Sequence, residues 1–211
     1  MGPLKAKSGR SNAWCWQWSE FILLEEATQI LFGHFENTNH SDFVFYSDRL
    51  IRLVVEEGLN RLPYSKITVK TPSDSFYEGI AFSRGNCGVS LCRSGEAMEQ
   101  ALRQCCRSIR IGKILVGDDT QLLYARLVPD IASRRVLLLY PILSTGFTVI
   151  KALTVLLKTG VDEGNTLLLT LFATPSSIKQ IMESFPKITI LTSDISFIIP
   201  YYFTTKYFGT D

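Results

Sequence analysis

From Gly88 onward, short apolar runs alternate with segments of helical spacing, and this alternation limits the chain to few folds. Four runs each precede a segment that is predicted to be helical, and a fifth run closes the series. Runs with few polar positions are typical of strands that are buried on both faces. The sequence therefore predicts an α/β domain with a mostly parallel central sheet flanked by helices.

The turns between these segments carry most of the polar and glycine residues. The strand–helix pairs are GVSLC with EAMEQALRQCCR, IGKILV with LLYARLV, RVLLLYPIL with VIKALTVLLKTG, and NTLLLTLFAT with SSIKQIMESF, and KITILTS is the last strand. The turns after the first three strands are 93-RSG-95, 117-GDDTQ-121 and 140-YPILSTGFT-148. Ligands of parallel sheets bind at the carboxyl ends of the strands, so these turns are the expected binding edge.

Upstream of Cys87 the sequence predicts a helix and a hairpin. Apolar residues between Asp48 and Leu62 fall on one broad face at helical spacing, which indicates an amphipathic helix. The runs 66-KITVKT-71 and 76-FYEGIAF-82 flank the turn sequence PSDS, which indicates a β-hairpin.

Residues 1–41 differ from the rest and are interpreted as an N-terminal extension of a domain formed by residues 42–211. They contain all three tryptophans and both histidines of the chain. Within them, WCWQW alternates as a strand does, and FILLEEATQILF has helical spacing. The domain is therefore expected to carry an N-terminal arm.

Composition excludes several classes of function. A formal charge of +2 is too small to favour a nucleic-acid partner, and no apolar run reaches the roughly 18 residues that span a membrane. The five cysteines form no CxxC pair and only two histidines are present, so no protein metal site is expected. The cysteines are interpreted as reduced thiols of a cytoplasmic protein, with the nucleus as a second compartment.

The turn after the third strand is a candidate anion site. Ser144, Thr145, Gly146 and Thr148 stand where a helix begins, and free backbone amides there bind phosphate groups. The alternative is that a hydroxyl simply caps the helix. Arg93, at the end of another strand, could hold a second phosphate through its planar fork of donors, or could pair with Glu96 or Glu99.

A second group of arginines lies on several elements, and two interpretations of it stay open. The group is a solvated surface or a regulatory anion pocket between subunits, and its members are Arg49, Arg84, Arg110, Arg134 and Arg135.

Several blocks of the chain resemble the uracil phosphoribosyltransferase family, its animal homologues above all. The blocks are FVFYSDRLIRLVVEEGLNRLPY, GNCGVSLCRSGEAMEQALRQCCRSIRIGKIL, VLLLYPILSTGFTVI and the terminal KYFGTD, and they lie in order between residues 42 and 211. The resemblance implies a type I phosphoribosyltransferase-like core. It implies pyrimidine salvage, in which uracil and phosphoribosyl pyrophosphate (PRPP) give UMP and pyrophosphate, with Mg²⁺ bound alongside PRPP.

The resemblance also assigns residues to ligands. The PRPP site would comprise Arg93, Tyr140, Pro141, Ile142, Leu143, Ser144, Thr145, Gly146, Phe147 and Thr148. The uracil site would comprise Tyr201, Tyr202 and Phe203. Some members respond to GTP as an allosteric effector, and the matching residues are Arg49, Ser83, Arg84, Gly85, Asn86, Arg110 and Arg134. The family further implies a homodimer with the 45–61 helix near the subunit contact.

The chain departs from the pattern of active members at four places. Tyr140 replaces an Asp, Phe147 replaces a small or polar residue, and the loop at 117–126 is a few residues shorter. The stretch 198–208 lacks the glycines and acids of the family's Gly-Asp-Ala-Gly-Asp-Arg segment. Two functions therefore stay open: a weak or inactive uracil phosphoribosyltransferase, and a pseudoenzyme that binds a nucleotide or PRPP and acts as an interaction or regulatory protein.

Overall fold

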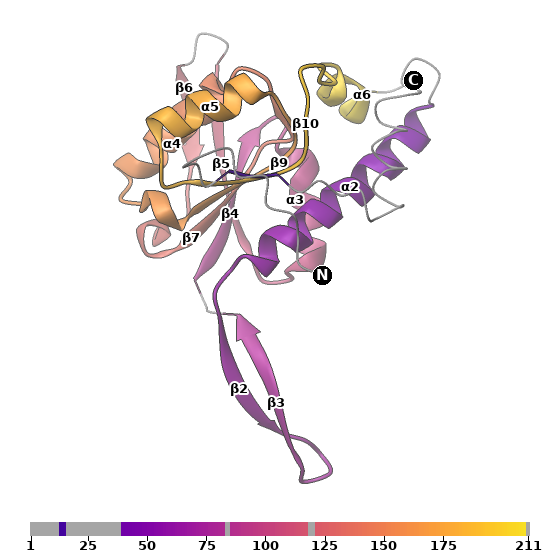
Figure 1. Ribbon diagram of the computed structural model, residues 1–211, viewed down its shortest axis with the longest axis vertical. Coiled ribbons are helices and arrows are strands. Elements are labelled where there is room, and N and C mark those ends of the chain that lie inside the picture. The colour runs from indigo at the N-terminus through magenta and orange to yellow at the C-terminus, as the bar shows by residue number, and fades with distance from the viewer. Residues whose placement is uncertain (1–12, 16–38, 83–84, 118–120, 210–211) are drawn as a thin grey trace.

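The computed structural model describes residues 13–15, 39–82, 85–117 and 121–209 (Figure 1). Within them, a mixed sheet of eight strands has the order β1-β10-β9-β7-β4-β5-β6, and β8 pairs with β9 beyond the end of β7. The strands are β1 Ala13–Cys15, β4 Asn86–Cys92, β5 Arg110–Val116, β6 Leu122–Arg126, β7 Arg135–Leu139, β8 Ile142–Leu143, β9 Thr166–Ala173 and β10 Thr189–Ile195. All pairings except that of β5 with β6 are parallel, which confirms the predicted α/β fold.

Helices cover both faces of this sheet (Figure 1). One core lies under α2 (His40–Asn60) and α3 (Glu96–Cys105), and the other lies under α4 (Phe147–Lys158) and α5 (Pro175–Ser184). A short helix, α6 (Phe203–Phe208), follows β10, and two 3₁₀ turns span Ile131–Ser133 and Glu163–Asn165. No helix in the described part of the chain is long and apolar enough to cross a membrane.

The order of the strands reverses between β4 and β7. From β4 the chain passes through α3 to β5 on one side, whereas from β7 it passes through α4 and α5 to β9 and β10 on the other side. Connections that leave neighbouring parallel strands in opposite directions open a crevice at their carboxyl ends. The turns after β4 and β7 therefore flank the expected binding position.

The prediction of a helix at LLYARLV is wrong, because Leu122–Arg126 forms the edge strand β6. The backbone amide of Gly117 donates to the carbonyl of Gln121 at 2.8 Å, so the connection from β5 is too short for a crossover helix. The next strand can only return antiparallel, and Leu115 pairs with Tyr124. One antiparallel edge on a parallel sheet is common in such folds.

The helix predicted from Asp48 begins eight residues earlier, at His40. Asn39 is its N-cap, since its side-chain oxygen accepts from the Asp42 amide at 2.8 Å. Near the other end of α2, a Cβ at Gly58 would lie 2.7 Å from a Leu169 methyl carbon. This close contact sets the helix against β9.

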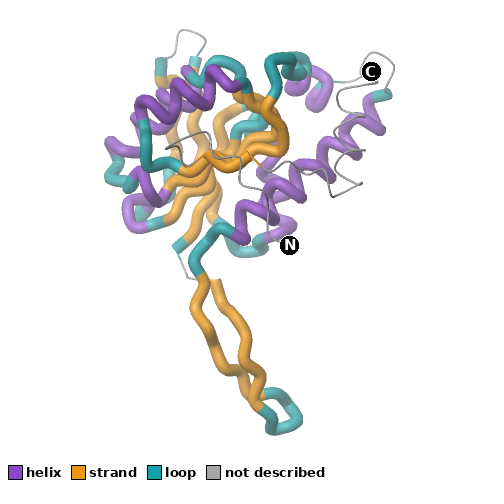
Figure 2. The backbone as a smooth tube through the Cα atoms, in the orientation of Figure 1, coloured by secondary structure: helices purple, strands orange, loops and turns teal. Residues whose placement is uncertain are grey.

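The predicted hairpin is confirmed as β2 (Tyr64–Lys70) and β3 (Phe76–Phe82), and it extends away from the body of the protein (Figure 2). Its pairing register places the charged residues of both strands on one face. The other face carries only uncharged residues, namely Ser65, Ile67, Val69, Tyr77, Gly79 and Ala81. Of these, Ile67, Val69 and Tyr77 are large and exposed.

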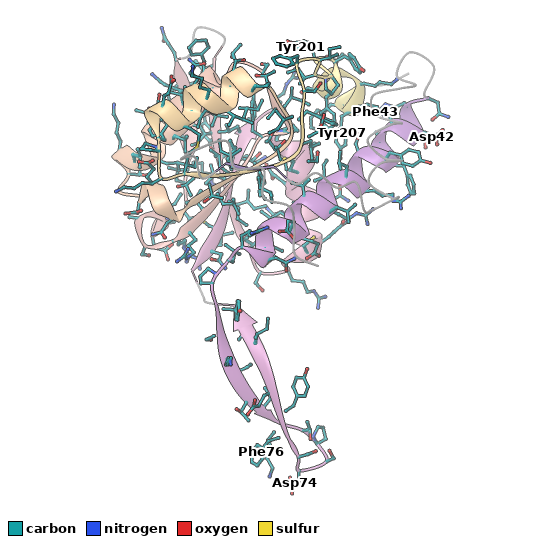
Figure 3. All side chains as sticks on the ribbon, in the orientation of Figure 1. Asp42, Phe43, Asp74, Phe76, Tyr201 and Tyr207 are labelled. Atoms are coloured by element: carbon teal, nitrogen blue, oxygen red, sulfur yellow. The ribbon has the colours of Figure 1, made fainter. Side chains whose placement is uncertain are left out.

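The C-terminal segment is held against α2 by an aromatic cluster. Phe203 is fully buried, and its ring lies 5.6 Å from the rings of Phe43 and Tyr207. The Tyr207 hydroxyl donates to the Asp48 carboxylate at 2.5 Å. Figure 3 shows Phe43 and Tyr207 together at this end of α2.

Part of the N-terminal extension joins the sheet. Ala13–Cys15 pairs in parallel with β10, which agrees with the strand-like alternation of WCWQW at Trp14 and Cys15. The segment FILLEEATQILF lies outside the described residues. The division into residues 1–41 and 42–211 stays a prediction.

Candidate functional site

The turns after β4 and β7 are brought together by a close approach of backbone. Within the β4–β7 ladder, Ser90 pairs with Leu139, the last residue of β7. A Cβ at Gly95 would lie 2.5 Å from the Leu139 carbonyl oxygen and 2.8 Å from that of Leu91, closer than any real contact. Glycine is therefore required where the first turn crosses the end of β7.

The first turn, 93-RSG-95, is closed by its own backbone and leaves the arginine exposed. The Gly95 amide donates to the Leu91 carbonyl at 2.8 Å, and the Glu96 amide donates to the Arg93 carbonyl at 3.0 Å. The Cys92–Arg93 peptide bond is cis. Arg93 thus stands at the carboxyl edge of the sheet, where the sequence places it.

The second turn, residues 140–148, is fixed from below by β9 and α5. The Pro141 carbonyl accepts from the amides of Leu171 and Phe172 at 2.9 and 3.1 Å. The Leu143 carbonyl accepts from the Thr174 amide at 3.0 Å. Hydroxyls add further bonds, Thr174 Oγ1 to the Ser144 carbonyl at 2.6 Å and Ser177 Oγ to the Leu143 carbonyl at 3.0 Å.

Helix α4 begins in this turn without a side-chain cap. Gly146 is its N-cap residue, with φ +85°, and neither Ser144 nor Thr145 accepts a hydrogen bond from the first amides. The alternative in which a hydroxyl caps the helix is therefore not what the structure shows. The first amides of this 12-residue helix therefore have no side-chain partner, and amides of this kind are able to donate to an anion.

Two aromatic side chains border this turn. Phe147 is 53% exposed, so its ring lies at the surface and not among the loop carbonyls. Tyr140 is half-buried against the core under α4 and α5. Neither side chain brings a negative charge to the site.

Of the arginines assigned to an effector that the structure describes, Arg110 and Arg134 lie together and Arg49 lies apart from them. Arg110 and Arg134 both approach Asp130, at 3.8 and 2.6 Å, and Arg134 also donates to the Asn86 carbonyl at 3.4 Å. The Arg134 guanidinium holds the pKa of Asp130 below its usual range. Gly85 adjoins this cluster, since its carbonyl accepts from the Arg135 amide at 2.9 Å.

This cluster lies at the amino ends of β4, β5 and β7, opposite to the edge that carries Arg93. Arg49 lies elsewhere, on α2, with its guanidinium 5.8 Å from the centre of the Phe45 ring. Ser83 and Arg84 lie outside the described residues. The assignment of all seven residues to an effector stays a prediction.

The residues assigned to uracil differ in exposure. Tyr201 is 74% exposed and Tyr202 is 42% exposed, whereas the ring of Phe203 belongs to the core. Phe203 could therefore meet a base only through its backbone. Asp194, at the end of β10, is a half-buried carboxylate close in sequence to this segment, and burial raises its pKa above the usual range.

Sequence reasoning missed two sets of residues that support the turns. Thr174 and Ser177 hold the second turn, and the segment Thr-Pro-Ser-Ser signalled only a helix start. Lys113 of β5 pairs with Glu96 and Glu99, which were considered as partners of Arg93. A lysine 17 residues away cannot be matched to a glutamate from spacing alone.

The family model described as uracil phosphoribosyltransferase matches residues 35–199. A uracil phosphoribosyltransferase homolog of Danio rerio is 56% identical over 181 residues, which cover 83% of this chain and 70% of the relative. The Homo sapiens homolog is 56% identical over the same share of this chain and 59% of its own length. The chain thus spans about three fifths to seven tenths of these relatives.

A second kind of relative is larger. Uridine kinase-like protein 5 of Arabidopsis thaliana is 47% identical over 188 residues, covering 83% of this chain and 40% of the relative. Among solved structures, the AQ2163 protein from Aquifex aeolicus matches with a TM-score of 0.71 and 19% identity, covering 83% of this chain and 84% of that one. APRTase from Giardia lamblia, complexed with 9-deazaadenine, matches with a TM-score of 0.50 and 14% identity, covering 75% and 85%.

We expect Asp194→Asn to stabilise the protein at neutral pH. Because the folded state raises the pKa of Asp194, the folded state binds the proton more tightly than the unfolded chain does. Protonated Asp194 therefore stabilises the folded state below the ordinary pKa of 3.8, and this stabilisation is lost as the pH rises through the pKa of Asp194 in the folded state. Denaturant unfolding should show a more stable variant at neutral pH and a smaller difference below pH 3.8.

The exposed Glu183→Gln is the matched control and should change little at either pH. An equal gain for Asp194→Asn at both pH values would contradict the argument from burial.

Proposed function

This chain belongs to the uracil phosphoribosyltransferase family, and from that premise we propose that it binds PRPP at the two turns that meet between β4 and β7. The observation that carries the proposal is the uncapped start of α4, which lies on the turn after β7, at the same edge of the sheet as the exposed Arg93 after the neighbouring strand β4. The 5-phosphate would accept hydrogen bonds from the amides that follow Gly146. The pyrophosphate would meet the guanidinium of Arg93.

Magnesium fits this proposal as a companion of the ligand. No group of three His, Cys, Asp or Glu side chains that could hold a metal gathers among residues 39–82, 85–117 and 121–209. Mg²⁺ keeps several waters and binds well through phosphate oxygens. We therefore propose that it enters with PRPP and neutralises the pyrophosphate, while Arg93 and the α4 amides orient the ligand.

The base side of the site supports PRPP binding better than uracil turnover. Residues 198–208 contain no carboxylate, and the exposed rings of Tyr201 and Tyr202 can stack on a base without selecting uracil. Tyr140 provides no negative charge to stabilise a ribose that becomes cationic in the transition state. We therefore propose pyrimidine salvage with slow UMP formation, and a non-catalytic PRPP-binding regulatory protein as the second candidate.

We also propose a homodimer with GTP as an effector. The exposed uncharged face of the hairpin supports self-association. The apolar side of α2 packs on its own sheet, so a contact near residues 45–61 would use exposed residues such as Phe45.

A GTP phosphate would have to replace Asp130 as the partner of Arg110 and Arg134. A monomer in light scattering at micromolar concentration would refute the dimer, and PRPP affinity that ignores GTP would refute the effector.

Gly146→Ala should weaken PRPP binding by about tenfold or more, because a side chain at φ +85° costs about 1–2 kcal/mol and shifts the α4 amides. Its Cβ would also lie 3.3 Å from the Ser177 carbonyl oxygen. Calorimetric titration with PRPP and Mg²⁺ measures this loss.

Gly160→Ala is the matched control, since Gly160 has φ +89° at the other end of the same helix. It should lower stability to a similar extent and leave PRPP affinity unchanged. Equal PRPP affinity of Gly146→Ala and the wild type would show that the turn does not bind the ligand.

Formation of UMP by the wild type should be slower than about 1 per second, the lower end of the ordinary enzyme range. Replacing Tyr140 by Asp together with a Gly-Asp-Ala-Gly-Asp-Arg tail should raise the rate by about tenfold to a hundredfold, as a restored charge-assisted hydrogen bond would. Radiolabelled uracil with PRPP measures the product. Tyr140→Phe, which removes only the hydroxyl, is the control, and wild-type turnover within the ordinary range would refute the proposal.

A further inference from the structure

The first turn of α3 presents an electrostatic conflict to any anion at Arg93. Glu96 and Glu99 both lie in that turn, immediately after 93-RSG-95. Carboxylates at a helix N-terminus stabilise the helix, but they also cancel the positive potential that an incoming phosphate group would use. With Arg93 alone, the turn and the start of the helix would carry a net charge of −1.

Lys113 of the neighbouring strand β5 neutralises this pair of carboxylates. Its Nζ lies 2.6 Å from Glu96 Oε1 and 3.2 Å from Glu99 Oε1. The Glu99 side chain is only 14% exposed, so its charge is poorly screened by water. The hydrogen bond to Glu96 raises the pKa of Lys113 above its ordinary value, at which a lysine is already charged at physiological pH.

The environment of Cys92 shows that Glu96 acts on the strand end beside the turn. Cys92 Sγ lies 3.7 Å from Glu96 Oε1. Burial first, and then Glu96, raise the pKa of Cys92 to about 11, while the charge of Lys113 acts in the opposite direction. Glu96 and Lys113 thus both lie beside the residue that immediately precedes Arg93.

We propose that Lys113 is a positioning residue of the pyrophosphate subsite, which holds Glu96 and Glu99 neutralised so that the turn at Arg93 can accept an anion. The inference rests on the proposed PRPP site and adds a residue from β5 to it. Lys113 does not contact the ligand in this arrangement, because its ammonium group is directed to the two carboxylates. Its effect on the ligand is electrostatic, through the charge of the α3 N-terminus.

The test is the affinity for inorganic pyrophosphate, measured by calorimetry on the full chain with Mg²⁺ held constant. Lys113→Met should weaken binding by about threefold to tenfold, as an unneutralised partly buried charge near a multiply charged anion would. Lys113→Arg should restore it. Adding Glu96→Gln to Lys113→Met returns the local charge to its original value and should also restore affinity, which a purely structural latch would not allow.

Lys158→Met is the control for a change of net charge. It removes one positive charge at the far end of α4 and should leave the affinity for pyrophosphate unchanged. The loss in Lys113→Met should also shrink at high salt. If Lys113→Met binds pyrophosphate as the wild type does, or if Glu96→Gln fails to restore binding, the inference is overturned while the proposed function stands. If the wild type binds no pyrophosphate, the inference is overturned together with the proposed role of Arg93 in PRPP binding, and PRPP titration decides separately on the α4 turn.

Discussion

The contact on which the site depends is the approach of two stretches of backbone at Gly95. The turn after β4 passes so close to the last residue of β7 that no side chain fits between them. Because β4 and β7 are also the strands from which the chain departs in opposite directions, this contact lies at the crevice of the sheet. The turn after β4 takes its position from this contact, and the turn after β7 begins at the same point.

The second turn shows how hydrogen bonding can leave donors available for a ligand. Its carbonyl groups are occupied by β9 and by the hydroxyls of Thr174 and Ser177, whereas the start of α4 has no side-chain cap. The carbonyl groups of this turn are therefore fixed by hydrogen bonds, whereas the first amides of α4 have no side-chain partner. Preorganisation of this kind lowers the entropic cost of binding a phosphate group.

Local pattern was sufficient to predict the parallel sheet, the hairpin and the position of both turns, because each depends on burial or turn chemistry within a few residues. It failed at Leu122–Arg126, where the shortness of the connection and not the spacing of apolar residues decides the structure. It also could not distinguish the buried Phe203 from the exposed Tyr201. The pairing of Lys113 with Glu96 depends on strand order, which no local pattern contains.

The hairpin β2–β3 differs from the sheet of the core in what stabilises it. Within the described residues its seven cross-strand pairs are the main interactions of the ribbon, and both faces are largely open to water. A lone two-stranded ribbon is marginally stable in water. The arm therefore takes its order from its own cross-strand pairing, and any surface that covers its uncharged face would add stability that the ribbon lacks by itself.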